Sequence, residues 1–270
     1  ASTTPPLATS GDSPVAVVTG AARGIGLAIA QWFLAQGHRV ALWDNDAAAL
    51  AQAAQALGQP DGVLALDCDV SQPDQVDAAT AHTAARFGRI DALVNNAGVA
   101  TFKPVLATSF EEWRWVMATN LDGAFLCTQA VAPVMLRNGG GAVVNIASIS
   151  GLRASTLRVA YGTSKAALIH LTKQHATELG TVGIRVNAIA PGPVETEMAK
   201  KVHSEAIRRD YFAVIPLARY GSTTEIANAV GFLCSPAASY INGQVLAVDG
   251  GFDGAGVGLP TLRETPRPGA

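Results

Sequence analysis

Short apolar runs alternate with longer amphipathic stretches along most of this chain. Seven apolar or β-branched runs are typical of strands: residues 15–19, 39–43, 62–66, 92–95, 142–147, 184–189 and 244–248. The stretches between them predict helices at residues 24–36, 47–57, 72–87, 110–137 and 159–181. Strands that alternate with helices form a parallel sheet covered on both faces, so we predict an α/β fold with a seven-stranded, doubly wound parallel sheet.

Prolines and glycines indicate where this fold begins, bends and ends. Pro73 lies at a predicted helix start, where proline is tolerated, whereas Pro133 would kink the helix at 110–137 or mark its last turns. No change in composition divides the chain, so we predict a single domain over residues 15–252. We expect a flexible extension at residues 1–14 and a tail at 253–270 that is disordered or packs against a neighbouring subunit.

The charge content narrows the classes of partner. The chain is 49% hydrophobic but only 15% charged, which indicates that part of its surface is buried between subunits. Its formal net charge is -2, and no basic run or stripe is present. Because nucleic-acid binding depends on such clustered cations, we expect a homo-oligomer that binds a small-molecule substrate and no nucleic acid.

Three features that the sequence lacks bear on cellular location and metal binding: a membrane span, a signal-peptide core and a metal-ligand pattern. No apolar stretch approaches the roughly 18 residues of a membrane span, and no signal-peptide core is visible, so we expect a cytoplasmic protein without a membrane partner. The three cysteines are far apart and odd in number, which favours reduced thiols. His170 and His175 lack an accompanying acidic ligand pattern, so we predict no catalytic metal.

A cluster of glycines follows the first predicted strand directly. The segment Thr-Gly-Ala-Ala-Arg-Gly-Ile-Gly runs from Thr19 to Gly26 and opens into the first predicted helix. Gly20, Gly24 and Gly26 would allow a tight turn and close approach to a pyrophosphate, whose charge the helix N-terminus would meet. A glycine cluster alone can be a simple turn, but a strand before it and a helix after it favour a dinucleotide site in a Rossmann-type sheet.

Acidic residues near the next two strand ends bear on which dinucleotide binds. Asp44 could accept hydrogen bonds from both adenosine ribose hydroxyls, whereas a 2′-phosphate would meet its negative charge. Arg23 could pair with that phosphate, but Asp44 and Asp46 make the local field acidic, so we expect NAD and consider NADP the alternative. Asp69 could accept from the adenine amino group or could simply cap the next helix.

Tyr161 and Lys165 stand four residues apart in the predicted helix at 159–181 and therefore share a face. This spacing alone also occurs on solvated helix faces. If the ammonium lies beside the phenol, it favours the phenolate and lowers the tyrosine pKa from its usual value of about 10. Tyr161 is thus a candidate proton shuttle.

With these segments assembled, the chain resembles the short-chain dehydrogenase/reductase family, in the branch with chains of about 250 residues. The resemblance covers roughly residues 15–252 and includes Asn95-Asn-Ala-Gly98 and Pro191-Gly-Pro193. It implies a catalytic set that is complete in this chain: Asn120, Ser148, Tyr161 and Lys165.

The resemblance also implies a role for each of these four residues. Tyr161 would exchange a proton with the oxygen at the reacting carbon, and Ser148 would hydrogen-bond that oxygen, although an isolated serine at a strand end is usually a cap. Lys165 would bind the nicotinamide ribose and lower the pKa of Tyr161. Asn120 would hold a water that links Lys165 to solvent, or would otherwise mark a local kink.

Motifs and resemblance together imply a larger cofactor site. Its expected residues are Gly20, Arg23, Gly24, Ile25, Gly26, Asp44, Asp69, Val70, Asn95, Ala97, Gly98, Tyr161, Lys165, Pro191, Gly192, Val194 and Thr196. Asn95 and Gly98 are expected at the adenosine part, and Val194 and Thr196 at the nicotinamide carboxamide. Asn95 could instead only tie neighbouring strands together, and Thr196 could only cap the following helix.

The reaction expected from these parts is a hydride transfer that uses a proton shuttle and no covalent nucleophile. We predict an NAD-dependent alcohol dehydrogenase or ketone reductase acting on a polyol, sugar, hydroxy acid or ring alcohol. The first alternative is an NADPH-dependent 3-oxoacyl thioester (acyl carrier protein) reductase, against which Asp44 argues. The second is a non-catalytic dinucleotide-binding regulator, which the complete catalytic set disfavours. The family commonly forms tetramers or dimers, so we expect a homotetramer or a homodimer.

Substrate specificity is expected from three segments around the catalytic set. The candidates are Ser150, Leu152, Arg153, Arg158, Met198, Tyr211 and Phe212. Residues 195–220 are mixed and polar, which suits a mobile lid that excludes water on closure. Arg153 could contact an anionic or hydroxyl-rich substrate, or could be a solvated surface arginine.

Overall fold

The computed structural model describes residues 13–256, so most of the predicted N-terminal extension and of the C-terminal tail lies outside the described residues. The strands are β1 (Val15–Thr19), β2 (Arg39–Asp44), β3 (Val63–Asp67), β4 (Ala92–Asn95), β5 (Gly141–Ile146), β6 (Ile184–Pro191) and β7 (Val245–Val248). The α-helices are α1 (Gly24–Ala35), α2 (Ala47–Leu57), α3 (Pro73–Phe87), α4 (Phe110–Met117), α5 (Gly123–Arg137), α6 (Ile149–Leu152), α7 (Val159–Leu179), α8 (Glu197–Val202), α9 (Glu205–Val214) and α10 (Thr223–Cys234).

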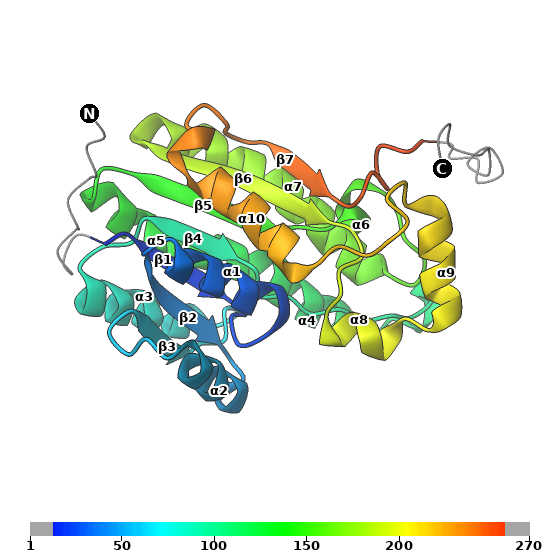
Figure 1. Cartoon of the computed structure of the whole chain (residues 1–270), viewed down its shortest axis with the longest axis horizontal. Coiled ribbons are helices and arrows are strands. Elements are labelled where there is room, and N and C mark those ends of the chain that lie inside the picture. Colours follow the sequence, from blue (N-terminus) through cyan, green and yellow to red (C-terminus); the bar gives the residue numbers. More distant parts are fainter. Residues whose placement is uncertain (1–12, 257–270) are drawn as a thin grey trace, which may run out of the picture.

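The seven strands form one parallel sheet in the order β3-β2-β1-β4-β5-β6-β7 (Figure 1). β1 pairs with β2 on one side and with β4 on the other, so the strand order reverses between β1 and β4. In such sheets ligands bind beyond the carboxyl ends of the strands at this reversal. The predicted seven-stranded, doubly wound fold is confirmed.

Helices cover both faces of the sheet, and alternate residues of each strand supply the two cores. Val18 of β1 joins a core with Phe33 of α1 and Val230 of α10, and Figure 1 shows both helices in front of the sheet. Val17 points to the opposite face and joins a second core with Val131 of α5. Because both faces are buried, the strands read as continuous apolar runs.

The predicted helix at residues 110–137 is interrupted in its middle. α4 ends at Met117, a π-helical turn η2 (Ala118–Asp122) follows, and α5 begins at Gly123. Asn120 lies in this widened turn and is buried. Pro133 lies inside α5, close to its end at Arg137. The predicted bounds of 110 and 137 therefore hold, but the π-helical turn was not predicted, because Asn120 is held by tertiary contacts that the apolar pattern does not encode.

The region after β6 contains more helix than the sequence pattern predicted. Residues 195–220, predicted as a lid, contain the short helices α8 and α9, which lie beyond the carboxyl ends of the strands (Figure 1). α10 follows and was not predicted. It begins with a capping box in which Ser222 and Glu225 each bond the backbone N–H of the other. The sequence Ser-Thr-Thr-Glu at 222–225 was the signal that could have located this start.

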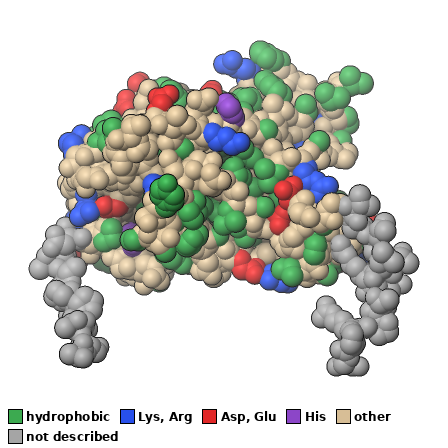
Figure 2. Space-filling model, turned by 90° about the horizontal axis from the view of Figure 1, so that it is seen from above, with side chains coloured by type: hydrophobic (Ala, Val, Ile, Leu, Met, Phe, Trp, Pro, Cys, Tyr) green, Lys and Arg blue, Asp and Glu red, His purple; other side chains and the backbone are tan. Residues whose placement is uncertain are grey.

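Charged side chains are interspersed over the face drawn in Figure 2, which shows acidic and basic groups among apolar and neutral ones and no band of a single sign. This distribution agrees with the formal net charge of -2. Within residues 13–256, no helix combines the length and the apolar character that crossing a bilayer requires.

Candidate active site

The glycine loop between β1 and α1 is folded tightly against itself. Gly20 and Gly24 have φ values of 61° and 57°, in the left-handed region that favours glycine. A Cβ on Gly26 would lie 2.1 Å from the carbonyl oxygen of Gly20, so no larger residue fits there without a shift of the loop. This is the tight turn that the glycine spacing predicted, and a phosphate contact at the start of α1 remains a prediction.

Asn96, which the sequence analysis did not single out, holds this loop in place. Its Nδ2 donates to the carbonyl oxygens of Thr19 at 2.9 Å and Gly20 at 3.0 Å. The backbone N–H groups of Asn96 and Ala97 both donate to Oγ1 of Thr19, each at 3.0 Å. The segment after β4 is therefore bonded to the segment after β1 across the reversal of strand order.

The neighbouring Asn95 has a different role from the one expected. Its side chain is buried and its Nδ2 donates to Oδ1 of Asn145 at 2.8 Å and to Oγ1 of Thr128 at 3.1 Å. The expected adenosine contact is therefore wrong for this side chain, and the alternative, a tie between strands β4 and β5, is what the structure contains. Strand alternation explains the difference, because Asn95 and Asn96 point to opposite sides.

Asp44 lies at the end of β2, beside the glycine loop. Its Oδ2 accepts from the backbone N–H of Ala22 at 2.9 Å, and its Oδ1 accepts from the backbone N–H of Asp46 at 3.0 Å. Each carboxylate oxygen can accept a second hydrogen bond, so both remain suitable for ribose hydroxyls. Arg23 pairs with Asp46, and the backbone N–H of Ala49 together with Arg23 lowers the pKa of that carboxyl. Arg23 therefore already has a carboxylate partner, at the exposed surface of the loop.

Asp69 and Val70 follow β3. Oδ1 of Asp69 accepts from both the backbone N–H and the hydroxyl of Ser71, at 2.9 and 2.7 Å, which shapes the turn before α3. Asp69 thus stabilises the turn before α3, which is close to the helix cap suggested as its alternative role, although the N-cap residue itself is Gln72. Val70 is buried against the start of α5, where a Cβ on Gly123 would lie 2.6 Å from Val70 Cγ2.

A cavity of about 210 Å³ lies beyond the carboxyl ends of β4, β5 and β6, and Ser148, Tyr161 and Lys165 line it. Ser148 follows β5 and caps α6, where its Oγ accepts from the backbone N–H of Ser150 at 3.1 Å. Tyr161 lies in the first turn of α7, close enough to Ser148 for that hydroxyl to lower the pKa of the phenol. The fold thus brings together three residues that lie as many as 17 positions apart.

Opposing influences act on the pKa of Tyr161. Burial raises its pKa, while the hydrogen bond from Ser148 and the charge of Arg158 act in the opposite direction. Nζ of Lys165 lies 5.7 Å from the centre of the Tyr161 ring and donates to the carbonyl oxygen of Ile146 at 2.7 Å. Burial lowers the pKa of Lys165 to about 8. Burial thus dominates the Tyr161 pKa and the cation that opposes it is Arg158, so the lowering of this pKa by Lys165 remains a prediction.

Asn120 is tied to the segment after β4. Its Oδ1 accepts from the backbone N–H of Val99 at 2.8 Å, and its Nδ2 donates to the Val99 carbonyl at 2.9 Å and to Oγ of Ser164 at 3.0 Å. A Cβ on Gly98 would lie 3.4 Å from Asn120 Oδ1 and 3.5 Å from Lys165 Nζ. Asn120 and Lys165 therefore flank the same glycine, which is the proximity that the predicted water link between them requires.

Six other residues of the expected cofactor site lie in the cavity wall: Ile25, Gly98, Pro191, Gly192, Val194 and Thr196. Thr196 also caps α8, where its Oγ1 accepts from the backbone N–H of Ala199 at 3.1 Å. The helix cap suggested for Thr196 is therefore present, and its nicotinamide contact remains a prediction. A Cβ on Gly24 would lie 3.9 Å from Thr196 Cγ2, so the glycine loop and the start of α8 face each other.

The substrate candidates divide into two groups. Ser150, Arg158 and Tyr211 line the cavity. Arg153 instead stacks on Phe252 at 5.5 Å and donates to its carbonyl oxygen at 2.9 Å, so the suggested substrate contact is replaced by an anchor for the C-terminal segment. Two further candidates, Leu152 and Phe212, are outside the described cavity wall, and the Met198 side chain is outside the part of the chain that the structure describes.

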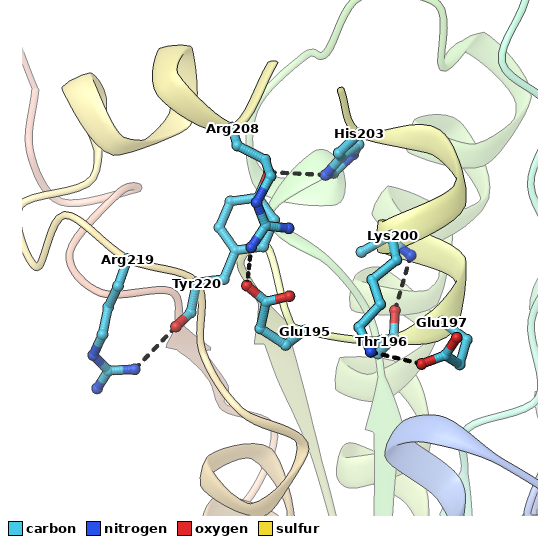
Figure 3. A network of polar contacts seen from close by, with 9 residues as sticks. Glu195, Thr196, Glu197, Lys200, His203, Arg208, Arg219 and Tyr220 are labelled. Carbon is cyan, nitrogen blue, oxygen red and sulfur yellow. Dashed lines mark hydrogen bonds and ion pairs between the residues drawn. The ribbon is translucent and has the colours of Figure 1, made fainter. Parts of the chain in front are cut away.

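The cavity wall also contains residues that no local sequence pattern had indicated, among them Val99, Phe102, Ala199, Val202 and His203. Nδ1 of His203 hydrogen-bonds the hydroxyl of Tyr220 at 2.9 Å, and burial lowers the pKa of His203 (Figure 3). The guanidinium of Arg208 lies 4.5 Å from the centre of the Tyr220 ring and pairs with Glu195. This network joins α8 and α9 to the rim of the cavity.

Comparisons with known proteins agree with this geometry. The family described as "Enoyl-(Acyl carrier protein) reductase" matches residues 20–253. A 3-oxoacyl-[acyl-carrier-protein] reductase from Synechocystis sp. is 40% identical over 241 residues, which cover 88% of this chain and 96% of the relative. D-threitol dehydrogenase from Mycolicibacterium smegmatis is 44% identical over 246 residues, with 89% and 93% covered. Reductases and dehydrogenases are thus similar to this chain to nearly the same degree.

A solved structure gives the same result at the level of the fold. The short-chain type dehydrogenase/reductase from Mycobacterium ulcerans superposes with a TM-score of 0.86 at 33% identity, and the match covers 89% of this chain and 90% of that one. The cavity therefore lies in a fold that is shared over nearly its whole length.

Proposed function

Because this chain belongs to the short-chain dehydrogenase/reductase family, we propose that it is an NAD(H)-dependent oxidoreductase that interconverts a secondary alcohol and a ketone. The observation that carries the proposal is the common cavity. Ser148, Tyr161 and Lys165 line it together with Ile25 and Thr196, which come from the two segments expected to hold the dinucleotide. Proton-transfer groups and cofactor groups therefore meet at one place.

The residues present fit a dinucleotide. Gly26 leaves no room for a Cβ beside the Gly20 carbonyl, which is the close backbone packing that a pyrophosphate site needs. Asp44 would hold the adenosine ribose, and Lys165 would hold the nicotinamide ribose. When bound, the nicotinamide ring supplies or accepts the hydride.

The chain's own residues would handle the proton. In the oxidation direction, the Tyr161 phenolate takes the hydroxyl proton of the substrate while the hydride leaves the carbon that bears that hydroxyl. Ser148 donates a hydrogen bond to the same oxygen and orients it toward Tyr161. In the reduction direction, Tyr161 returns the proton to the developing alkoxide. A Tyr161→Phe variant should lose about 10²- to 10⁴-fold in kcat while it still binds NADH.

The preference for NAD is supported by Asp44 and by the pairing of Arg23 with Asp46. A 2′-phosphate would meet the Asp44 carboxylate, and it would compete with Asp46 for the nearby Arg23 guanidinium. Initial rates with NADH and NADPH test this preference directly, and Asp44→Ala should reduce the NADH preference. A wild-type protein that prefers NADPH would overturn the assignment of Asp44.

A second candidate function is reduction of a 3-oxoacyl thioester on a carrier protein with NADPH. The 40% identity to the Synechocystis reductase supports this candidate. Parallel assays should separate the two, one with a 3-oxoacyl thioester and NADPH and one with alcohols, polyols and hydroxy acids and NAD. Tyr161→Phe serves as the control in both assays.

A further inference from the structure

Arg158 is a partly buried cation in the wall of the catalytic cavity. Its guanidinium carbon lies 4.8 Å from the centre of the Phe102 ring and 5.8 Å from the centre of the Tyr161 ring. We infer that Arg158 binds an anionic group of the substrate, so that the natural alcohol is a hydroxy acid whose carboxylate lies a few bonds from the reacting carbon. The inference rests on the proposed function and names the substrate class of the same site.

The charge of Arg158 is not matched by a protein carboxylate. None of the ion pairs found within the described part of the chain includes Arg158. Carboxylates on neighbouring segments pair with other cations, Glu112 with Lys103 and Glu195 with Arg208. Cations that are partly removed from water usually have a counter-ion, so a substrate carboxylate is the natural partner for this one.

The cavity as a whole favours an anion. Its charged wall residues are Arg158 and Lys165, and none of the described wall residues is Asp or Glu. Lys165 donates to the Ile146 carbonyl and is assigned to the cofactor ribose. Arg158 is therefore the wall cation that remains for the substrate, and its planar guanidinium can bind a carboxylate through two hydrogen bonds.

The backbone that carries Arg158 is fixed to the segment after β4. Leu157 has a φ of 62°, which is unusual for a residue other than glycine, and its carbonyl accepts from the Lys103 N–H at 3.1 Å. An isolated parallel bridge joins Lys103 to Arg158. Residues held in such sparsely populated conformations are concentrated at binding sites, where the surrounding structure maintains them.

The same features disfavour the other substrate classes. A neutral polyol would leave the Arg158 charge without a partner beside the reacting carbon. A 3-oxoacyl thioester is also neutral near its reacting carbonyl. Substrate selection by the charge next to the reaction centre is therefore expected to reject both relative to an oxo acid.

The test compares oxo acids with their neutral methyl esters. We would measure kcat/KM for 2-oxobutanoate, 3-oxobutanoate and 4-oxopentanoate and for the three methyl esters, with NADH. For at least one acid, the wild-type protein should prefer the acid to the ester by about 10- to 100-fold, which is the range expected for a hydrogen-bonded charge pair. Arg158→Gln should remove that preference, and Arg158→Lys should retain part of it. Equal acid-to-ester ratios in the wild type and in Arg158→Gln would overturn the inference.

A matched control and a binding measurement complete the design. Arg153→Gln removes a nearby arginine that stacks on Phe252, and it should leave the acid-to-ester ratio unchanged. Titration calorimetry of each oxo acid and ester into protein saturated with NAD⁺ reports binding affinity alone. Neither NAD⁺ nor the ketone can donate a hydride, so no reaction takes place. Acid-selective binding that Arg158→Gln abolishes would support the anion site even if turnover were absent, in which case only the proposed function would fail. Equal affinity for acid and ester would overturn the anion site alone.

Discussion

At the scale of single residues, Tyr161 is subject to opposing influences. Burial favours its neutral phenol, whereas the hydrogen bond from Ser148 and the charge of Arg158 favour the phenolate. The charge of Arg158 therefore has two effects: it attracts the proposed anionic substrate, and it makes Tyr161 a stronger acid. These effects can be separated with a neutral substrate, for which only the second one matters.

The effect of Arg158 on acidity predicts a change in pH dependence. Oxidation of a neutral alcohol needs the Tyr161 phenolate, so its rate should rise as pH rises through the tyrosine pKa. Because Arg158 lowers that pKa, Arg158→Gln should move the rising limb to higher pH, while Arg158→Lys should move it less. The measurement is log kcat/KM against pH for one neutral alcohol. An unchanged limb would mean that the charge of Arg158 does not reach the phenol.

At the scale of elements, the glycine loop and α1 form one unit. Gly26→Ala would place a Cβ 2.1 Å from the Gly20 carbonyl oxygen. The loop must then shift, and we expect NADH to bind about 10- to 100-fold more weakly with a lower melting temperature, in line with an overpacking cost of about 1–3 kcal/mol. Fluorescence titration with NADH and a thermal melt test this expectation. Gly254→Ala, where the new Cβ would meet open space, is the control and should change neither quantity.

The start of α10 predicts how acid affects stability. Glu225 bonds Arg219 and the Ser222 N–H, and these contacts lower its pKa from 4.5 to about 2. A depressed carboxyl pKa contributes stability above the unfolded value of 4.5, and the contribution is lost as pH falls toward 2. Glu225→Gln should therefore be less stable than wild type at pH 7, by at most about 1 kcal/mol because the pair is exposed. Denaturant unfolding measures the difference in unfolding free energy between wild type and Glu225→Gln. This difference should be smaller at pH 3 than at pH 7, and an equal difference at both would contradict this account.

At the scale of the whole molecule, assembly remains a prediction. The low charged fraction of 15% is accompanied by exposed apolar side chains on α4, α5 and β7. Trp115 is 50% exposed, and Phe125 and Leu246 are each 42% exposed. Light scattering coupled to size exclusion should give a mass near four times 27.7 kDa, or twice that value for a dimer. Phe125→Asp should reduce this mass, whereas Leu106→Asp, at a position that is 99% exposed, should not. A monomeric wild type would contradict the prediction.

Local patterns predicted those parts of the fold whose residues act on their neighbours in sequence. Strand β1, helix α2 and the glycine loop were located because apolar alternation, helix starts and glycine turns depend on neighbouring residues. The π-helical turn at Asn120 was missed, because it depends on hydrogen bonds to Val99 and Ser164, far away in sequence. α10 was missed although its capping box was readable.

The sequence by itself determined the α/β class and located the glycine loop, because both depend on short-range patterns. It named Ser148, Tyr161 and Lys165 through a family resemblance, and their catalytic roles remain a prediction. Only the tertiary structure decided which neighbours these residues have. In it, Asn95 lies in the core, Asn96 bonds the glycine loop, and Arg153 stacks on Phe252. Arg158 lies beside Tyr161, and none of the described wall residues of the cavity is acidic. Charge and burial at a site depend on distances in space, and residues brought together from several strand ends set those distances.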